Sequence, residues 1–166
     1  LYERAQENST LYTHIPAIQP VAQSDLIMIS SDFGIRSDPF FLIEQVHSGL
    51  DFVAPRGKNV YATGDGIVTF AQYSRTGYGN EIVIDHKFRF GSRYAHLDTI
   101  FVKEGETVRR GQAIGTVGAT GRATGPHLHY EVLYERRQVN PSYYFDTSLT
   151  TNEYAQIISI ANEKTN

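Results

Sequence analysis

The pattern of apolar and polar residues changes twice along the chain. The first part is largely polar; a short helix is expected around Leu1 to Asn8, and Pro16 and Pro20 would break any long helix after it. The middle part consists of short β-branched and aromatic runs separated by turn residues, and the last part changes to helical spacing. We therefore predict three parts, which are an N-terminal arm (1–25), a β-rich domain (26–146) and a C-terminal helical extension (147–166).

The β-rich part has six runs that are typical of strands, at residues 59–62, 67–70, 81–86, 91–96, 112–117 and 128–134. Asp65-Gly66 separates the first two runs and predicts a hairpin, and residues 87–90 predict a second hairpin between the third and fourth. Short connections of this kind join antiparallel strands. The pattern therefore predicts a mainly β fold built on an antiparallel sheet.

The C-terminal extension has apolar residues at helical spacing, namely Tyr154, Ile157, Ile158 and Ala161. Thr151 or Asn152 precedes this stripe and would cap the helix. We expect the helix to pack outside the sheet.

Composition excludes some classes of protein. A chain of 166 residues with 40% hydrophobic and 20% charged residues is typical of one globular domain. The net charge is −3, and no run of Lys or Arg is longer than a pair, so we expect no nucleic-acid partner. The cluster Lys87, Arg89 and Arg93 surrounds a predicted turn and is expected to be solvated.

The ends of the chain and its lack of cysteine bear on location and metal chemistry. Without Cys, any metal site must use His and carboxylate ligands. The sequence contains no run of about 18 apolar residues, the length that a membrane-spanning helix needs. The chain begins with Leu1 rather than Met, and we expect a targeting segment or membrane anchor upstream of it.

Two histidines that follow a glycine-rich run are the main candidates for chemistry. His127 and His129 would lie about 6.6 Å apart on one face of a strand. His47 and Asp51 would be about 13 Å apart in an extended strand, too far for one metal ion, so we expect a bend at Gly49. Three ligands drawn from these residues would leave a zinc position open for water. The spacing does not decide between His127 and His129 as the ligand.

The other histidines of the sequence have different expected roles. The segment around His47 is poor helix material and has no Glu after the histidine, which argues against a helical HExxH site. A base must therefore come from elsewhere, and His96 can supply it because an imidazole titrates near neutral pH. His14 and His86 are expected to be surface or hydrogen-bonded core residues.

The segments FGIR, HSGLDF, ATGDG, GNEIVIDH, YAHL and GPHLHYEV occur in this order between Ser31 and Tyr144. In these motifs the chain resembles the lysostaphin-type, or LytM-like, zinc endopeptidases of bacterial cell walls. The resemblance implies a lysostaphin-type β core and a zinc ion bound by His47, Asp51 and His129. It also implies that His96 and His127 are an unligated catalytic pair.

The same resemblance implies amide hydrolysis in peptidoglycan, with stem peptides as the partner and zinc as the cofactor. The bond between D-alanine and the side-chain amine of meso-diaminopimelate is the expected target, and the expected location is the bacterial cell envelope, in the periplasm. Many relatives have a tyrosine six residues before the first ligand, where this chain has Phe41. One hydroxyl donor to the oxyanion would then be missing, which can cost about 3 kcal/mol of transition-state stabilisation.

The sequence is also compatible with two other functions. A weakly active or inactive zinc protein could regulate another wall hydrolase, and Phe41 is the feature that favours this alternative. Residues 102–112 also resemble half of a biotinyl or lipoyl carrier domain. Such carriers need a modifiable lysine in a tight hairpin, and Lys87 lacks the expected neighbours.

Overall fold

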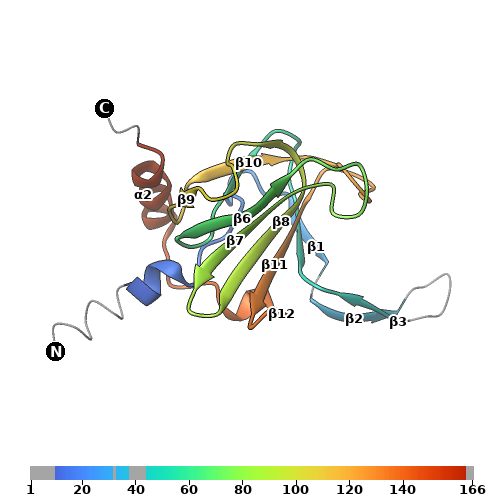
Figure 1. Cartoon of the computed structure of the whole chain (residues 1–166), viewed down its shortest axis with the longest axis horizontal. Coiled ribbons are helices and arrows are strands. Elements are labelled where there is room, and N and C mark those ends of the chain that lie inside the picture. Colours follow the sequence, from blue (N-terminus) through green and yellow to red (C-terminus); the bar gives the residue numbers. More distant parts are fainter. Residues whose placement is uncertain (1–9, 32, 38–43, 164–166) are drawn as a thin grey trace.

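The computed structural model describes residues 10–31, 33–37 and 44–163, and a ten-stranded antiparallel sheet is its main element (Figure 1). The main path of the sheet runs β1-β4-β11-β8-β7-β6-β9, while β10 pairs with β5 and β8, and β12 pairs with β11. Its strands are β1 (Met28–Ser31), β4 (Leu50–Val53), β5 (Asn59–Tyr61), β6 (Gly66–Gln72), β7 (Asn80–Lys87), β8 (Phe90–Ile100), β9 (Thr107–Val108), β10 (Ala113–Val117), β11 (Leu128–Tyr134) and β12 (Arg137–Val139).

A separate two-stranded ribbon consists of β2 (Gly34–Ser37) and β3 (Glu44–His47). Figure 1 shows this ribbon projecting from the main body, on the side away from the C-terminal helix α2 (Thr151–Ala161). The mainly β, antiparallel fold with a C-terminal helix is therefore confirmed.

The strand runs are present, but one of the two predicted hairpins is wrong. β7 and β8 form the second hairpin, and both residues of its turn, Phe88 and Arg89, have positive φ. β5 does not pair with β6; it pairs with β10, and β6 pairs with β7 and β9. Residues 63–65 instead hydrogen-bond the N-terminal segment, with the Asp65 N–H donating to the Thr13 carbonyl. The chain therefore does not form a tight turn between β5 and β6.

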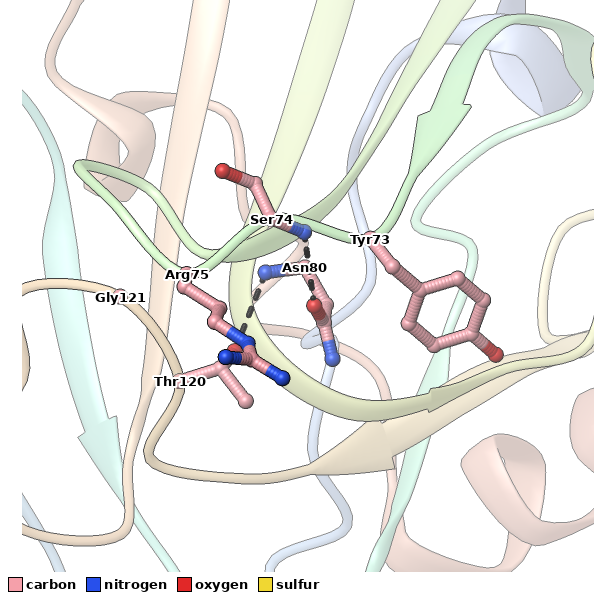
Figure 2. A pocket seen from close by; sticks show the side chains of 6 residues that line it. All are labelled: Tyr73, Ser74, Arg75, Asn80, Thr120 and Gly121. Atoms are coloured by element: carbon pink, nitrogen blue, oxygen red, sulfur yellow. Dashed lines mark hydrogen bonds between the residues drawn. The ribbon is translucent and has the colours of Figure 1, made fainter.

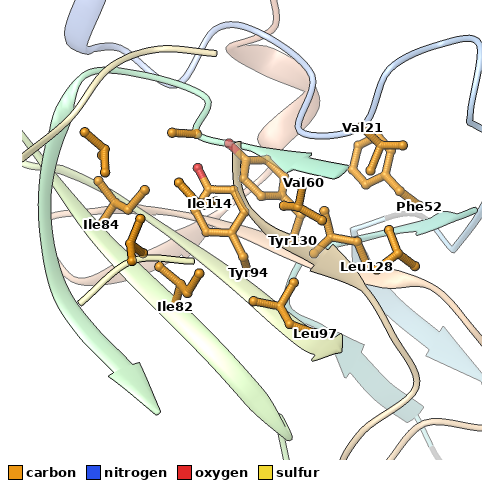
Figure 3. Close-up of a cluster of buried hydrophobic side chains, with 14 of the residues drawn as sticks. Val21, Phe52, Val60, Ile82, Ile84, Tyr94, Leu97, Ile114, Leu128 and Tyr130 are labelled. Atoms are coloured by element: carbon orange, nitrogen blue, oxygen red, sulfur yellow. The ribbon is translucent and has the colours of Figure 1, made fainter. Parts of the chain in front are cut away.

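One face of the central strands forms the hydrophobic core (Figure 3). Tyr94 and Tyr130 are fully buried at its centre with ring centroids 5.4 Å apart, and Phe52 meets Tyr130 edge to face. Such aromatic pairs contribute about 0.5–1.5 kcal/mol beyond the area they bury. β11 is buried on both faces, because Leu128, Tyr130 and Val132 face this core while the residues between them face the candidate site.

The first and last described segments pack on the outside of the sheet. Residues 10–14 are helical, and Ile18 and Val21 are buried after them. The helix predicted near Leu1 lies outside the described residues. Thr150 rather than Thr151 caps α2, because Glu153, three residues later, completes a capping box with it.

Side chains of α2 hold it against the rest of the protein. Asn162 bonds both the Gly111 carbonyl and the Ala113 N–H, and the Tyr154 hydroxyl donates to the Gln19 carbonyl. In the described part of the chain, no helix combines the length and the apolar character that crossing a membrane would require.

Candidate metal centre

The junction between β3 and β4 brings His47 and Asp51 together. β3 ends at His47 and β4 begins at Leu50, so the chain turns at Ser48-Gly49 as expected. A side chain at Gly49 would overlap the carbonyl oxygen of Tyr130, so the turn can pass this close to β11 only with glycine. The bend places His47 Nε2 3.3 Å from Asp51 Oδ2.

β11 adds the third member of the cluster. His129 lies directly opposite Asp51 in the β4–β11 pairing, and its Nδ1 is 2.8 Å from Asp51 Oδ1. One donor atom from each of His47, Asp51 and His129 falls within 4.8 Å of the others. Two imidazoles and a carboxylate are the donor types of open zinc sites, so these three residues fit a zinc ion.

His96 reaches this cluster through a β-bulge in β8. Strict alternation would place it on the core side with Ser92 and Tyr94. The β7–β8 register gains one residue in β8 between Tyr94 and Leu97, and His96 has a φ of 61°. A bulge with a left-handed residue redirects the side chain, and the His96 ring lies 6.1 Å from that of His129.

His127 lies beside His96, just before β11. The two rings have centroids 4.9 Å apart, and His127 Nε2 is 3.9 Å from Asp51 Oδ1. Each Nδ1 is fixed by a backbone carbonyl, that of Thr120 for His96 and that of Gly125 for His127. Because an N–H must donate to each carbonyl, the Nε2 atom of each neutral ring keeps its lone pair. The structure thus brings together all five residues that the sequence singled out.

Sequence reasoning missed a buried carboxylate behind His129. The Glu131 side chain is fully buried, and its Oε2 lies 2.9 Å from His129 Nε2. The hydroxyls of Tyr78 and Ser48 donate to the same oxygen at 2.7 and 2.8 Å. Its signal was its position two residues after His129, which puts both side chains on one face of the strand.

Arg93 corrects the expectation of a solvated basic cluster. Its guanidinium donates to Glu131 Oε1 at 2.6 Å and to Glu81 Oε2 at 3.0 Å, and it stacks over the Tyr78 ring. Lys87 and Arg89 are exposed as expected. The difference arises because Arg93 lies opposite Glu131 in the sheet, whereas Lys87 ends β7 and Arg89 lies in the turn that follows.

Opposite charges control the pKa values in this cluster. Burial alone would raise the pKa of Glu131, but hydrogen bonds from His129, Tyr78 and Ser48 together with the Arg93 charge lower it to about 2. Burial would lower the pKa of His129, but its bonds to Asp51 and Glu131 raise it to about 9. Burial lowers the pKa of His96, which favours the neutral ring with an accepting Nε2.

A hollow of about 420 Å³ lies beside Thr120, the residue whose carbonyl binds His96 (Figure 2). It is lined by Tyr73, Ser74, Arg75, Asn80, Thr120 and Gly121. Thr120 connects the two features, because its carbonyl binds His96 while its hydroxyl accepts from the Asn80 N–H. The hollow contains the guanidinium group of Arg75.

Comparison with known proteins identifies the family. Residues 45–141 match the model of peptidase family M23, which is more than half of the chain. The chain belongs to peptidase family M23, and the resemblance inferred from the motifs is confirmed.

Curated relatives include enzymes and an activator. The chain is 44% identical over 128 residues to the DD-carboxypeptidase/endopeptidase Mpg of Neisseria meningitidis serogroup B, covering 77% of this chain and 29% of Mpg. It is 51% identical over 94 residues to the peptidoglycan DD-endopeptidase ShyB of Vibrio cholerae, covering 57% and 22%. It is 39% identical over 107 residues to the murein hydrolase activator NlpD of Escherichia coli K12, covering 64% and 28%. The chain thus spans less than a third of the length of each.

Solved structures share the fold. A zinc-containing peptidase from Vibrio cholerae superposes with a TM-score of 0.70 at 44% identity, covering 74% of this chain and 38% of that chain. The catalytic domain of lysostaphin from Staphylococcus simulans superposes with a TM-score of 0.63 at 29% identity, covering 70% and 90%. Phe41, expected to replace an oxyanion donor, lies outside the described residues.

Proposed function

We propose that this chain is a zinc-dependent endopeptidase that hydrolyses peptide cross-links of bacterial peptidoglycan in the cell envelope, on the periplasmic side. The observation that carries the proposal is the arrangement of five side chains. His47, Asp51 and His129 converge as a ligand set, and two further imidazoles lie beside them with accepting Nε2 atoms. Membership of a peptidase family supports the same conclusion.

The ligand set would be His47, Asp51 and His129. Zinc bound there supplies a Lewis acid that polarises the scissile carbonyl and makes water a stronger nucleophile near neutral pH. Two neutral donors and one anion leave the site a net positive charge, which suits an anionic transition state.

His96 and His127 would move the protons of the reaction. Their Nδ1 protons are held by backbone carbonyls, so Nε2 is the atom that can accept a proton from the attacking water. The same Nε2–H can then donate to the leaving amine or to the charged tetrahedral oxygen. The bulge at His96 serves this role, since it turns the ring away from the core.

We infer that the target is the bond between D-alanine and the side-chain amine of meso-diaminopimelate. Two relatives that act as DD-endopeptidases, ShyB and Mpg, support this substrate class. Stem peptides in such cross-links carry free carboxylates. The hollow beside Thr120 offers Arg75 to a carboxylate and amide and hydroxyl groups to an extended backbone.

A regulator of another wall hydrolase is the second candidate. The likeness to the activator NlpD favours it. The complete set of three candidate ligands favours the enzyme instead, because a regulator has no need of two imidazoles beside three metal ligands.

Digestion of defined cross-linked muropeptides separates these functions. We expect the zinc-loaded protein to convert directly cross-linked dimers into monomers, detected by mass spectrometry, and a chelator to stop the reaction until zinc is restored. Cleavage of pentaglycine bridges while direct dimers persist would refute the proposed bond. If neither substrate is cut, the regulator becomes the favoured function.

A further inference from the structure

The carboxylate of Glu131 is buried and has an unusual number of donors for a residue with no contact to solvent. Two hydroxyls and one imidazole nitrogen converge on Oε2. The Arg93 guanidinium and the Gln138 amide, at 2.6 and 3.2 Å, contact Oε1. Burying a carboxylate is costly unless it is paired and hydrogen-bonded. Five partners around one buried carboxylate therefore indicate that its charge has a function.

The two nitrogens of His129 face opposite ways. Nδ1 faces Asp51 at 2.8 Å, on the side where the ligand atoms converge, and Nε2 faces Glu131 at 2.9 Å. If Nε2 carries the proton, it donates to the carboxylate, and Nδ1 presents its lone pair to the cluster. The Tyr78 ring also stacks on the imidazole, with centroids 5.9 Å apart.

We propose that Glu131 is a positioning residue that keeps His129 in the Nε2–H tautomer and so prepares Nδ1 as the metal ligand. This inference rests on the proposed metal site. Carboxylates that accept the second N–H of a ligating histidine fix its orientation and raise its basicity. Arg93, Tyr78 and Ser48 hold the carboxylate itself in place.

Zinc affinity of a matched pair of variants tests the proposal. Glu131→Gln keeps the size of the side chain but removes its charge, and Glu81→Gln removes the other carboxylate that pairs with Arg93 without touching His129. In competition with a chromophoric chelator, we expect zinc to bind about 10–100-fold more weakly to Glu131→Gln. We expect less than a twofold change in Glu81→Gln. Equal affinity of folded Glu131→Gln and wild type would overturn the proposal.

A second measurement does not depend on the variant folding. In zinc-loaded wild-type protein, ¹⁵N NMR of the His129 ring should show a proton on Nε2 and the metal on Nδ1. Metal on Nε2 would overturn the proposal even if zinc binds. A wild-type protein that binds no zinc would instead refute the metal site on which the inference rests, so the two failures are distinguishable.

Discussion

His129 and His86 are buried in the same sheet, but the groups around them differ. His129 lies between the carboxylates of Asp51 and Glu131, which raise its pKa to about 9 against the effect of burial. Among the described residues His86 hydrogen-bonds the Asp65 carbonyl and the Ser92 hydroxyl, and burial lowers its pKa to about 4. Burial alone therefore does not decide whether a histidine is charged, because charged partners can outweigh it.

The two regions differ in what they can exchange with solvent. Around His129 the groups are charged, and Asp51 retains some exposure. Around His86 a closed chain of neutral groups continues through Ser92, Tyr94 and Thr63 to the Tyr130 hydroxyl. In the proposed metal site the charged region would exchange a proton for a metal ion, and we expect the neutral network to contribute to stability instead. Variants in the first region should change chemistry, and variants in the second should change the free energy of unfolding.

The largest effect is expected for Asp51→Ala. Removing the anionic ligand should abolish zinc binding and reduce turnover to background, because the remaining imidazoles lose both a donor and a neutralising charge. Elemental analysis after gel filtration checks the metal content. A full equivalent of zinc in the variant would show that Asp51 is not a ligand.

Next come the two imidazoles beside the ligand set. His96→Asn and His127→Ala should keep zinc but lose about 10²–10⁴-fold in turnover, the scale of a positioned acid or base. Asparagine is used at position 96 because it tolerates positive φ, so the bulge should persist. Metal analysis and steady-state assays check both variants. Loss of zinc from both would move them into the ligand set, and unchanged turnover would remove their proposed role.

The pH dependence of the free energy of unfolding tests the neutral region around His86. With an unfolded-state pKa near 6.5 and a folded-state pKa of about 4, His86 binds more protons in the unfolded chain between these values. Its contribution to stability is complete above pH 6.5 and decreases as the pH falls to 4. The total loss is on the order of 3 kcal/mol, at about 1.4 kcal/mol per pKa unit.

Urea unfolding of metal-free protein across this pH range checks the effect, with His86→Gln for comparison. The variant should lose less stability between pH 6.5 and 4, since it has no proton to take up. Parallel pH profiles for the two proteins would contradict the account of His86.

The smallest effect is expected for Tyr94→Phe. Its hydroxyl accepts from the Thr63 N–H at 3.0 Å and bonds Ser92 at 2.9 Å, so its loss leaves buried groups unsatisfied. We expect about 1–3 kcal/mol of destabilisation with zinc affinity unchanged. Tyr12→Phe, which removes an exposed bond to Asp146, is the control and should change stability far less. A weaker zinc site in Tyr94→Phe would show that the two regions are coupled.

Local pattern predicted much of this molecule, and long-range pairing limited the rest. The alternation in β11 predicted the shared face of His127 and His129, and the spacing of His47 and Asp51 predicted the turn at Gly49. The pairing of β5 with β10 could not be predicted, because it depends on how residues 63–65 contact the N-terminal segment rather than on either strand.

The geometry at His96 and Glu131 could not be predicted for a different reason. The positive φ of His96 is set by the surrounding sheet. No glycine stands at this position to indicate it in the sequence. Glu131 lies in the GPHLHYEV motif, but its proposed role depends on hydrogen bonds from Arg93, Tyr78 and Ser48. These three residues are distant in sequence and meet Glu131 only in the folded protein.

A crystal structure of the zinc-loaded protein, with anomalous data collected at the zinc edge, tests the separation of ligands from proton-transfer groups most directly. We expect one anomalous peak, from a zinc ion bonded to His47, Asp51 and His129 Nδ1. His96 and His127 should lie beside it without bonding to it. A peak bonded to His96 or His127, or the absence of any peak at this cluster, would contradict this separation.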